Sequence, residues 1–198
     1  MAYLLDAPTD QRSTFSGITW ERFKLIEQGF SQSPGVRLFY CDGALEIVTV
    51  SPEHEIFSRL IGFLIQVFLT ELDVDFEPTG SMTQEKEGEA SVQADESYCL
   101  GRLKTPADLA IEIVFTSGTV GKLDRYQALG VSEVWFWEDG FFSFYHLRDN
   151  GYDRIHRSEL PHLENLDLEL LSRCVLMAQT SKSQAVKLIR QAAQSHSA

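Results

Sequence analysis

Two carboxylates and one lysine are the residues of this chain whose types and spacing best suit catalytic chemistry. Asp95 lies in a stretch that predicts a strand over residues 92–100, and Glu112 lies in a second predicted strand, 109–115, that is otherwise apolar. An ionised glutamate among such side chains is costly unless a partner or a metal compensates its charge. Lys122 follows in the first turns of a predicted helix and can carry its ammonium back to the strand ends.

The two acids meet if their strands are neighbours. Side chains alternate between the faces of a strand, so Asp108 and Glu112 share one face. Asp95 and Glu112 then face one cleft, and we expect their carboxylates about 4–6 Å apart, given metal–ligand distances near 2.0–2.1 Å. Such a pair suits Mg²⁺ or Mn²⁺, which take oxygen ligands and keep waters for a substrate phosphate. Lys122 is expected to point towards Glu112 or Asp108, where it can orient water or steady negative charge.

Simpler interpretations stay open for each of these residues. Asp95 alone could be an exposed strand residue, Glu112 could belong to a structural ion pair, and Lys122 could be a solvated helix lysine. Asp108 could cap the start of its strand or orient Lys122. His54 on an amphipathic helix is typical of a packed or hydrogen-bonded side chain. Glu112→Gln is expected to abolish cleavage at little cost in stability, and could even raise the stability of the metal-free protein, because an uncompensated carboxylate is a burden in an apolar strand.

Other common chemistries fail on spacing. His54 and Glu55 begin like a zinc-protease helix, but the second histidine four residues further on is absent. The chain has no G-x-S-x-G nucleophile elbow and no G-x-G-x-x-G dinucleotide motif. Gly121 and Lys122 resemble the end of a phosphate loop, but Leu123 stands where that loop needs a hydroxyl.

Length and composition limit the class of protein. The 198 residues, 43% of them hydrophobic, indicate one folded domain rather than a disordered chain. The net charge of −12 is opposite to that of a general nucleic-acid coat, although it allows a small basic groove. Three scattered cysteines argue against a disulfide framework, so we expect a reducing cytoplasm. No apolar run suits a membrane span, and the N-terminal residues lack the pattern of a secretory signal.

The hydrophobic pattern predicts a mixed α/β order of elements. Thr19 can cap a helix that begins at Trp20, and Ser51 can cap a helix over residues 52–72. The apolar stripe of this second helix is predicted to be buried and comprises Ile56, Leu60, Phe63, Leu64, Val67 and Phe68. Hairpins are predicted at residues 42–43, 139–140 and 150–151, where Asp-Gly or Asn-Gly separates apolar runs.

The remaining segments complete this order. Residues 74–78 and 134–137 predict strands, and the polar stretch 80–90 predicts a loop. A helix is predicted to start at residues 116–118 and to end at Gly130, and another to span 163–177. We expect one domain over residues 1–178, followed by a basic tail, 179–198. Residues 184–193 of the tail could form a helix, either solvated or touching DNA or a partner.

Several stretches resemble one known family in order and spacing: residues 40–47 (YCDGALEI), 51–55 (SPEHE), 94–98 (ADESY), 108–118 (DLAIEIVFTSG) and 122–135 (KLDRYQALGVSEVW). They resemble the Uma2 family of restriction-endonuclease-like proteins, a branch of the PD-(D/E)XK nuclease superfamily. The resemblance covers about residues 20–176. It implies a restriction-endonuclease-like core, a mixed sheet flanked by helices, here with an added N-terminal helix and β-hairpins.

The resemblance also implies roles for individual residues. Asp95 stands for the first aspartate of the motif and Glu112 for its second acid, so both would hold the metal. The superfamily places its lysine two positions after the second acid, where this chain has Val114; Lys122 resembles a lysine that has moved to the next helix. A helix acid near the site is typical of the superfamily, and Glu55 or Glu53, with His54 beside them, could fill that place.

Two functions follow as hypotheses. The first is a metal-dependent DNA endonuclease that hydrolyses phosphodiester bonds with Mg²⁺ or Mn²⁺, using Asp95, Glu112 and Lys122. Nucleases that cut two strands often act as dimers, so the first hypothesis includes a homodimer. The second is a non-catalytic module that keeps the fold and interacts with protein or DNA. The acidic net charge favours the second hypothesis, and the expected burial of Glu112 together with the intact set of Asp95, Glu112 and Lys122 favours the first.

Overall fold

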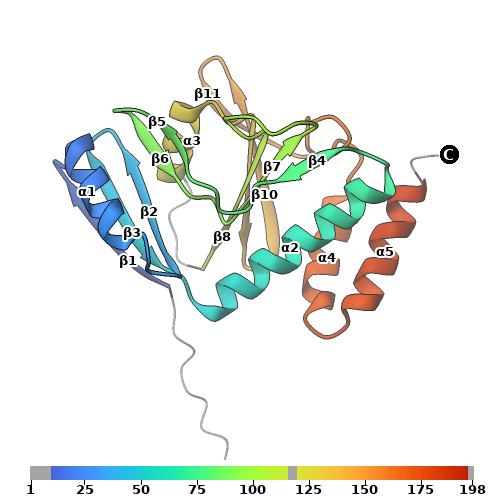
Figure 1. The fold of residues 1–198 in the computed structure, drawn as a ribbon. Coiled ribbons are helices and arrows are strands. Elements are labelled where there is room, and N and C mark those ends of the chain that lie inside the picture. Colours follow the sequence, from blue (N-terminus) through green and yellow to red (C-terminus); the bar gives the residue numbers. More distant parts are fainter. Residues whose placement is uncertain (1–9, 116–119, 196–198) are drawn as a thin grey trace, which may run out of the picture.

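Two β-sheets and five helices make up residues 10–115 and 120–195, the part of the chain that this computed structural model describes (Figure 1). The five-stranded sheet has the order β1 (Gln11–Ser16), β3 (Ala44–Thr49), β2 (Val36–Cys41), β6 (Ala90–Val92) and β5 (Gln84–Lys86). The six-stranded sheet has the order β11 (Gly151–Ile155), β10 (Phe141–Arg148), β9 (Glu133–Glu138), β8 (Leu109–Val114), β7 (Glu96–Leu100) and β4 (Phe76–Pro78). The helices are α1 (Trp20–Phe30), α2 (Pro52–Glu71), α3 (Val120–Leu129), α4 (Leu168–Ala178) and α5 (Lys182–Ser195).

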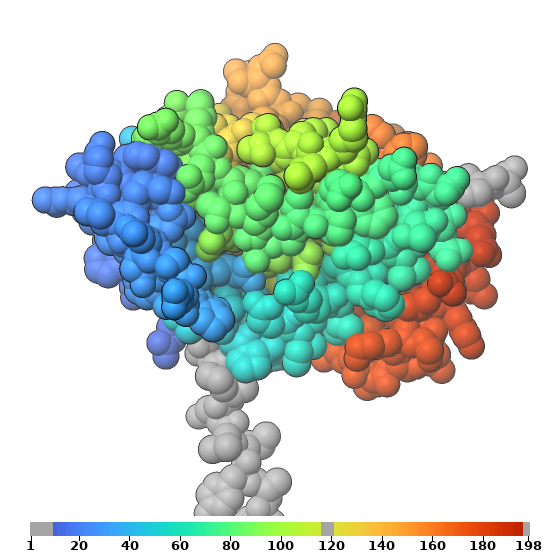
Figure 2. Space-filling view, in the orientation of Figure 1, coloured from blue at the N-terminus to red at the C-terminus, as the bar shows by residue number. Residues whose placement is uncertain are grey.

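The six-stranded sheet is mixed, because β8 and β9 pair in parallel while its other neighbours are antiparallel. The parallel pair is joined through α3, as a crossover connection requires. Helices α2, α4 and α5 lie on one side of this sheet (Figure 1). In the space-filling view, α1 and strands β1 to β3 form one end of the molecule in blue, and α4 and α5 lie towards the other end in red (Figure 2).

The side-chain alternation along β8 divides the core into two layers. Ile111 and Ile113 join the apolar side chains of α2, α4 and α5. Ala110 and Val114 point the other way, into a second cluster with α3 and the five-stranded sheet. Glu112 lies on the same face of β8 as Ala110 and Val114, so its carboxylate lies between the two sheets rather than in the helical core.

Several local predictions are confirmed. The Thr19 and Ser51 side chains cap α1 and α2, accepting from the N–H groups of Arg22 (3.4 Å) and His54 (3.3 Å). Asp42 turns the first hairpin with a positive φ of 45°, as an Asp-Gly turn requires. Gly130 ends α3 in the left-handed conformation that favours glycine. The predicted start of α3 at residues 116–118 lies outside the described residues.

Other local predictions are wrong. Strand 92–100 is broken into β6 and β7, and the predicted loop 80–90 contains β5. β1 carries no apolar signal because all its residues are exposed, yet it pairs with β3 along its whole length. The last predicted helix starts five residues late, at Leu168, because Asp167 caps it and accepts from two backbone N–H groups. Ile56 and Phe63 are exposed rather than buried.

The basic tail forms α5 and packs against α2 and α4. Its Ala185, Ile189 and Ala193 are fully buried in the main core. Arg190 pairs with Glu71 at the end of α2, with 2.9 Å between Nε and Oε1. One face of this helix is therefore core, and only its other face is solvated.

Gly62 marks the closest approach of α2 to the six-stranded sheet. A Cβ there would lie 2.9 Å from Cδ of the buried Glu96, whereas a Cβ at Gly29 in α1 would meet nothing within 4 Å. Alanine favours a helix by about 0.5–1 kcal/mol over glycine at an open site, but overpacking costs about 1–3 kcal/mol. We therefore expect Gly62→Ala to be about 1–3 kcal/mol less stable than Gly29→Ala in urea unfolding. Equal stabilities would contradict this packing.

Candidate active site

Asp95 lies in the break between the two sheets, one residue before β7 begins. Its N–H donates to the Ile111 carbonyl at 3.1 Å. β7 pairs with β8 so that Glu96 lies opposite Ile111, and the same register continued by one residue sets Asp95 opposite Glu112. Directly opposed side chains of an antiparallel pair share one face. Asp95 and Glu112 accordingly line the same pocket between the two sheets.

The Asp95 carboxylate is held from three sides. Its Oδ2 accepts a hydrogen bond from the Ile113 N–H at 2.7 Å. Its Oδ1 lies 2.8 Å from His54 Nε2 and 3.2 Å from Arg37 Nε, two ion pairs that lack the direction of regular hydrogen bonds. Burial raises the pKa of Asp95, but His54, Arg37 and the Ile113 N–H outweigh burial and hold this pKa below its ordinary value. Asp95 is therefore an ionised carboxylate inside the protein.

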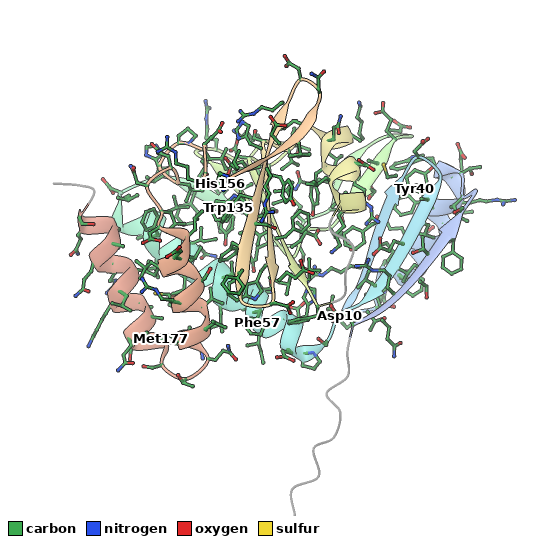
Figure 3. All side chains as sticks on the ribbon, turned by 180° about the vertical axis from the view of Figure 1, so that it is seen from behind. Asp10, Tyr40, Phe57, Trp135, His156 and Met177 are labelled. Atoms are coloured by element: carbon green, nitrogen blue, oxygen red, sulfur yellow. The ribbon has the colours of Figure 1, made fainter. Side chains whose placement is uncertain are left out.

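His54 connects Asp95 to Asp10, the residue before β1. The His54 Nδ1 lies 2.7 Å from Asp10 Oδ2, and Asp10 Oδ1 accepts from the Ser51 N–H at 2.7 Å. Burial lowers the pKa of His54, but its contacts with the two carboxylates raise it to about 9. His54 is thus an imidazolium at neutral pH. Figure 3 shows Asp10 close to the first turns of α2, which carry Phe57.

Glu112 is 2% exposed and has a partner for each of its oxygens. Lys122 Nζ lies 2.8 Å from Oε2, and the Tyr126 hydroxyl donates to Oε1. Lys122 and Tyr126 lie four residues apart on α3, so one face of that helix holds the whole carboxylate. Burial raises the pKa of Tyr126 well above its ordinary value, and the Glu112 charge adds to this rise. Tyr126 therefore remains a protonated donor.

The supporting acids lie in different places. Asp108 precedes β8 at the end remote from the pocket; it accepts from the Leu100 N–H at 2.8 Å and pairs with Lys104 at 2.6 Å. Of its two predicted roles, orienting Lys122 is not the one observed, because Lys122 pairs with Glu112. Glu55 is half-buried and pairs with Arg37, with 2.8 Å between Oε1 and Nη2.

The other helix acid, Glu53, is exposed, whereas Glu55 is half-buried. Glu55 is the helix acid that reaches the site, and it does so through the guanidinium that also pairs with Asp95. The catalytic and metal-binding roles of Asp95, Glu112 and Lys122 remain predictions.

Three residues of the site were missed in the sequence. Arg37 interrupts the apolar strand β2, and an isolated arginine in such a strand is a signal that a buried carboxylate lies near it. Tyr126 stands four residues after Lys122, a spacing that puts both on one helix face. Asp10 has no comparable signal, because it reaches His54 from 44 residues away.

The carboxylates of Asp95 and Glu112 suit a hard divalent cation that needs only a few protein ligands. Mg²⁺ is usually bound through one or two carboxylates, with waters and substrate phosphate as the other ligands. Asp95 and Glu112 supply two carboxylates, and within residues 10–115 and 120–195 no cluster of three or more acid, histidine or cysteine side chains forms a metal cage. Each of their four oxygens contacts a protein donor, so a metal at Glu112 Oε2 would have to displace Lys122.

The mixed six-stranded sheet, with helices on both of its faces, agrees with a restriction-endonuclease-like core. Residues 20–177 match the model of the Uma2 family, described as "Putative restriction endonuclease", and the chain belongs to this family. No curated protein matches the chain. Among the described residues, no helix has both the length and the apolar character needed to cross a membrane.

Proposed function

We propose that this protein is a metal-dependent DNA endonuclease whose active site contains Asp95, Glu112 and Lys122. The observation that carries the proposal is the opposition of two buried carboxylates across β7 and β8, with a buried lysine on one of them. Asp95 and Glu112 would hold Mg²⁺ or Mn²⁺. When bound there, the metal supplies a water of lowered pKa and neutralises charge on the phosphate.

The chain's own residues prepare this chemistry. His54 and Arg37 fix the Asp95 carboxylate, and Tyr126 fixes one oxygen of Glu112. Lys122, once released from Glu112 Oε2, keeps its ammonium at the site, where it can donate to a phosphate oxygen or orient the attacking water. Lys122 would thus serve as the lysine of the superfamily motif, supplied from α3 instead of the strand.

A non-catalytic interaction module is the second candidate. One observation favours it: every oxygen of Asp95 and Glu112 is already paired with a protein cation or donor. Such a pairing satisfies the acids without metal. The net charge of −12 also disfavours broad contact with DNA.

A cleavage assay separates the two functions. Supercoiled plasmid and end-labelled oligonucleotides are incubated with purified protein and Mg²⁺, Mn²⁺ or a chelator. The endonuclease proposal expects cleavage with either metal and none with chelator. A protein that binds DNA or another macromolecule but cleaves nothing under these conditions is the interaction module.

The oligomeric state belongs to the same proposal. A dimer supplies one site for each strand of a duplex, so we propose a homodimer as the form that cuts duplex DNA. Light scattering of the purified protein, with and without a short duplex, measures its mass. A single-chain mass in both conditions would contradict the dimer.

A further inference from the structure

A hollow of about 600 Å³ lies on the outer side of α2, where the start of α5 meets it. Leu60 forms its floor, and Ile56, Phe63 and Lys182 stand around it. Ile56 and Phe63 are 55% and 45% exposed, although they fit the apolar stripe of an otherwise buried helix. Figure 2 shows α2 open at the surface beside the red C-terminal helices. Two large apolar side chains therefore face solvent in a concave place.

The hollow adjoins the candidate active site. Glu55 borders the hollow, and its Oε1 pairs with Arg37 at 2.8 Å. Arg37 in turn pairs with Asp95 inside the pocket. His54, the residue before Glu55, lines the pocket itself. His54 and Glu55 are consecutive residues of α2, so the pocket and the hollow lie next to each other along this helix.

The charge around the hollow suits a phosphate backbone. The Arg59 side chain is 73% exposed. Its Nη1 lies 3.5 Å from Oε1 of Glu96, a long distance for an ion pair. Lys182 is exposed at the start of α5. No acid follows Glu169 in the sequence, so α5 carries only basic charges on a chain of net charge −12. Glu55 is the acid that borders the hollow, and Arg37 neutralises it.

We propose that the hollow binds unpaired nucleotides of the DNA strand that enters the active site. This inference rests on the proposed function and names its substrate class: DNA with a single-stranded segment, such as an overhang or flap, next to the cleaved phosphodiester. Bases inside a duplex hide their faces, whereas unpaired bases can stack on an exposed aromatic ring. Phe63 and Ile56 supply the apolar platform, and Arg59 and Lys182 pair with the phosphates.

Binding measurements with three labelled DNAs test this substrate class: a single strand, a duplex with an overhang, and a blunt duplex. Anisotropy is recorded in Ca²⁺ for the parent, Phe63→Ala and Phe141→Ala; Phe141 is a 74% exposed phenylalanine on β10, outside the hollow. Loss of one stacked base weakens binding about tenfold. We expect this loss for Phe63→Ala with the first two DNAs only, and none for Phe141→Ala.

A second variant tests the charge contacts independently of stacking. Arg59→Gln removes one cation beside the hollow, so the slope of log affinity against log salt should fall by about 0.7 for the single strand. An unchanged slope would show that Arg59 does not pair with phosphate and would count against the path of the strand over this surface.

The outcomes distinguish this inference from the proposed function. The inference is overturned if Phe63→Ala binds all three DNAs as tightly as the parent. It is also overturned if the variant loses as much affinity for the blunt duplex as for the other two DNAs. A change of mass for Phe63→Ala in light scattering, with DNA binding unchanged, also overturns it and assigns the hollow to a contact between copies. If the parent still cleaves DNA in these cases, the endonuclease proposal stands. A parent that neither binds nor cleaves DNA contradicts both.

Discussion

Glu112→Gln is expected to lower metal-dependent DNA cleavage by at least about a thousandfold. The substitution keeps the shape of the side chain and removes one of the two charges proposed to hold the metal. A catalytic metal contributes several kcal/mol to transition-state stabilisation, and each 1.4 kcal/mol corresponds to about tenfold in rate. Initial cleavage rates of parent and variant at saturating Mn²⁺ measure the loss.

Glu96→Gln is the matched control for this substitution. Glu96 is also a buried glutamate, one residue after Asp95, but its side chain contacts Ser58 and Arg59 of α2 on the other face of the sheet. Burial raises the pKa of Glu96, and its side chain does not line the pocket. We expect this variant to cleave like the parent. If Glu112→Gln cleaves as well as the parent, the assignment of these residues is wrong and another site must be sought.

Lys122→Met is expected to lower the free energy of unfolding of the metal-free protein by about 3–5 kcal/mol. Removing one partner of a buried ion pair leaves the other charge uncompensated, and here that charge is the Glu112 carboxylate. Glu112→Gln should also destabilise the metal-free protein, because it leaves the buried ammonium of Lys122 without a negative partner. The premise that Glu112 is uncompensated in the metal-free protein is wrong, because Lys122 and Tyr126 contact its two oxygens.

A double-mutant cycle measures this coupling. The variant Glu112→Gln with Lys122→Met carries neither charge and keeps an oxygen that accepts from Tyr126, so it should recover most of the stability lost by either single variant. Urea unfolding of the four proteins without metal gives the four free energies. Additive losses in the double variant would show that the two side chains are not coupled in solution.

The sequence predicted most reliably what local chemistry decides. Thr19 and Ser51 mark helix starts because their hydroxyls cap exposed N–H groups, and Asp42 turns a hairpin because its backbone tolerates a positive φ. Glu112 was also identified from its local context, because a charged residue in an apolar strand is costly without a partner. Lys122 was correctly placed towards that residue.

Long-range packing decided the rest. Asp10, just before β1, and Arg37, in β2, reach the site from the five-stranded sheet, and neither local sequence shows which residue it contacts. The strand break at Asp95 arises because β6 and β7 belong to different sheets, which the continuous pattern of residues 92–100 conceals. Ile56 and Phe63 follow the helical period of buried residues, yet they lie on the outer side of α2, where no described element packs over them.

A crystal soaked in Mn²⁺ and measured at the manganese absorption edge tests the central claim most directly. The account predicts an anomalous peak between the carboxylates of Asp95 and Glu112, within about 2.0–2.4 Å of an oxygen from each, with Lys122 Nζ moved away from Glu112 Oε2. The peak should be absent from a crystal of Glu112→Gln. Manganese bound elsewhere, or an undisturbed ion pair between Lys122 and Glu112 at saturating Mn²⁺, would contradict a metal-dependent nuclease at this site.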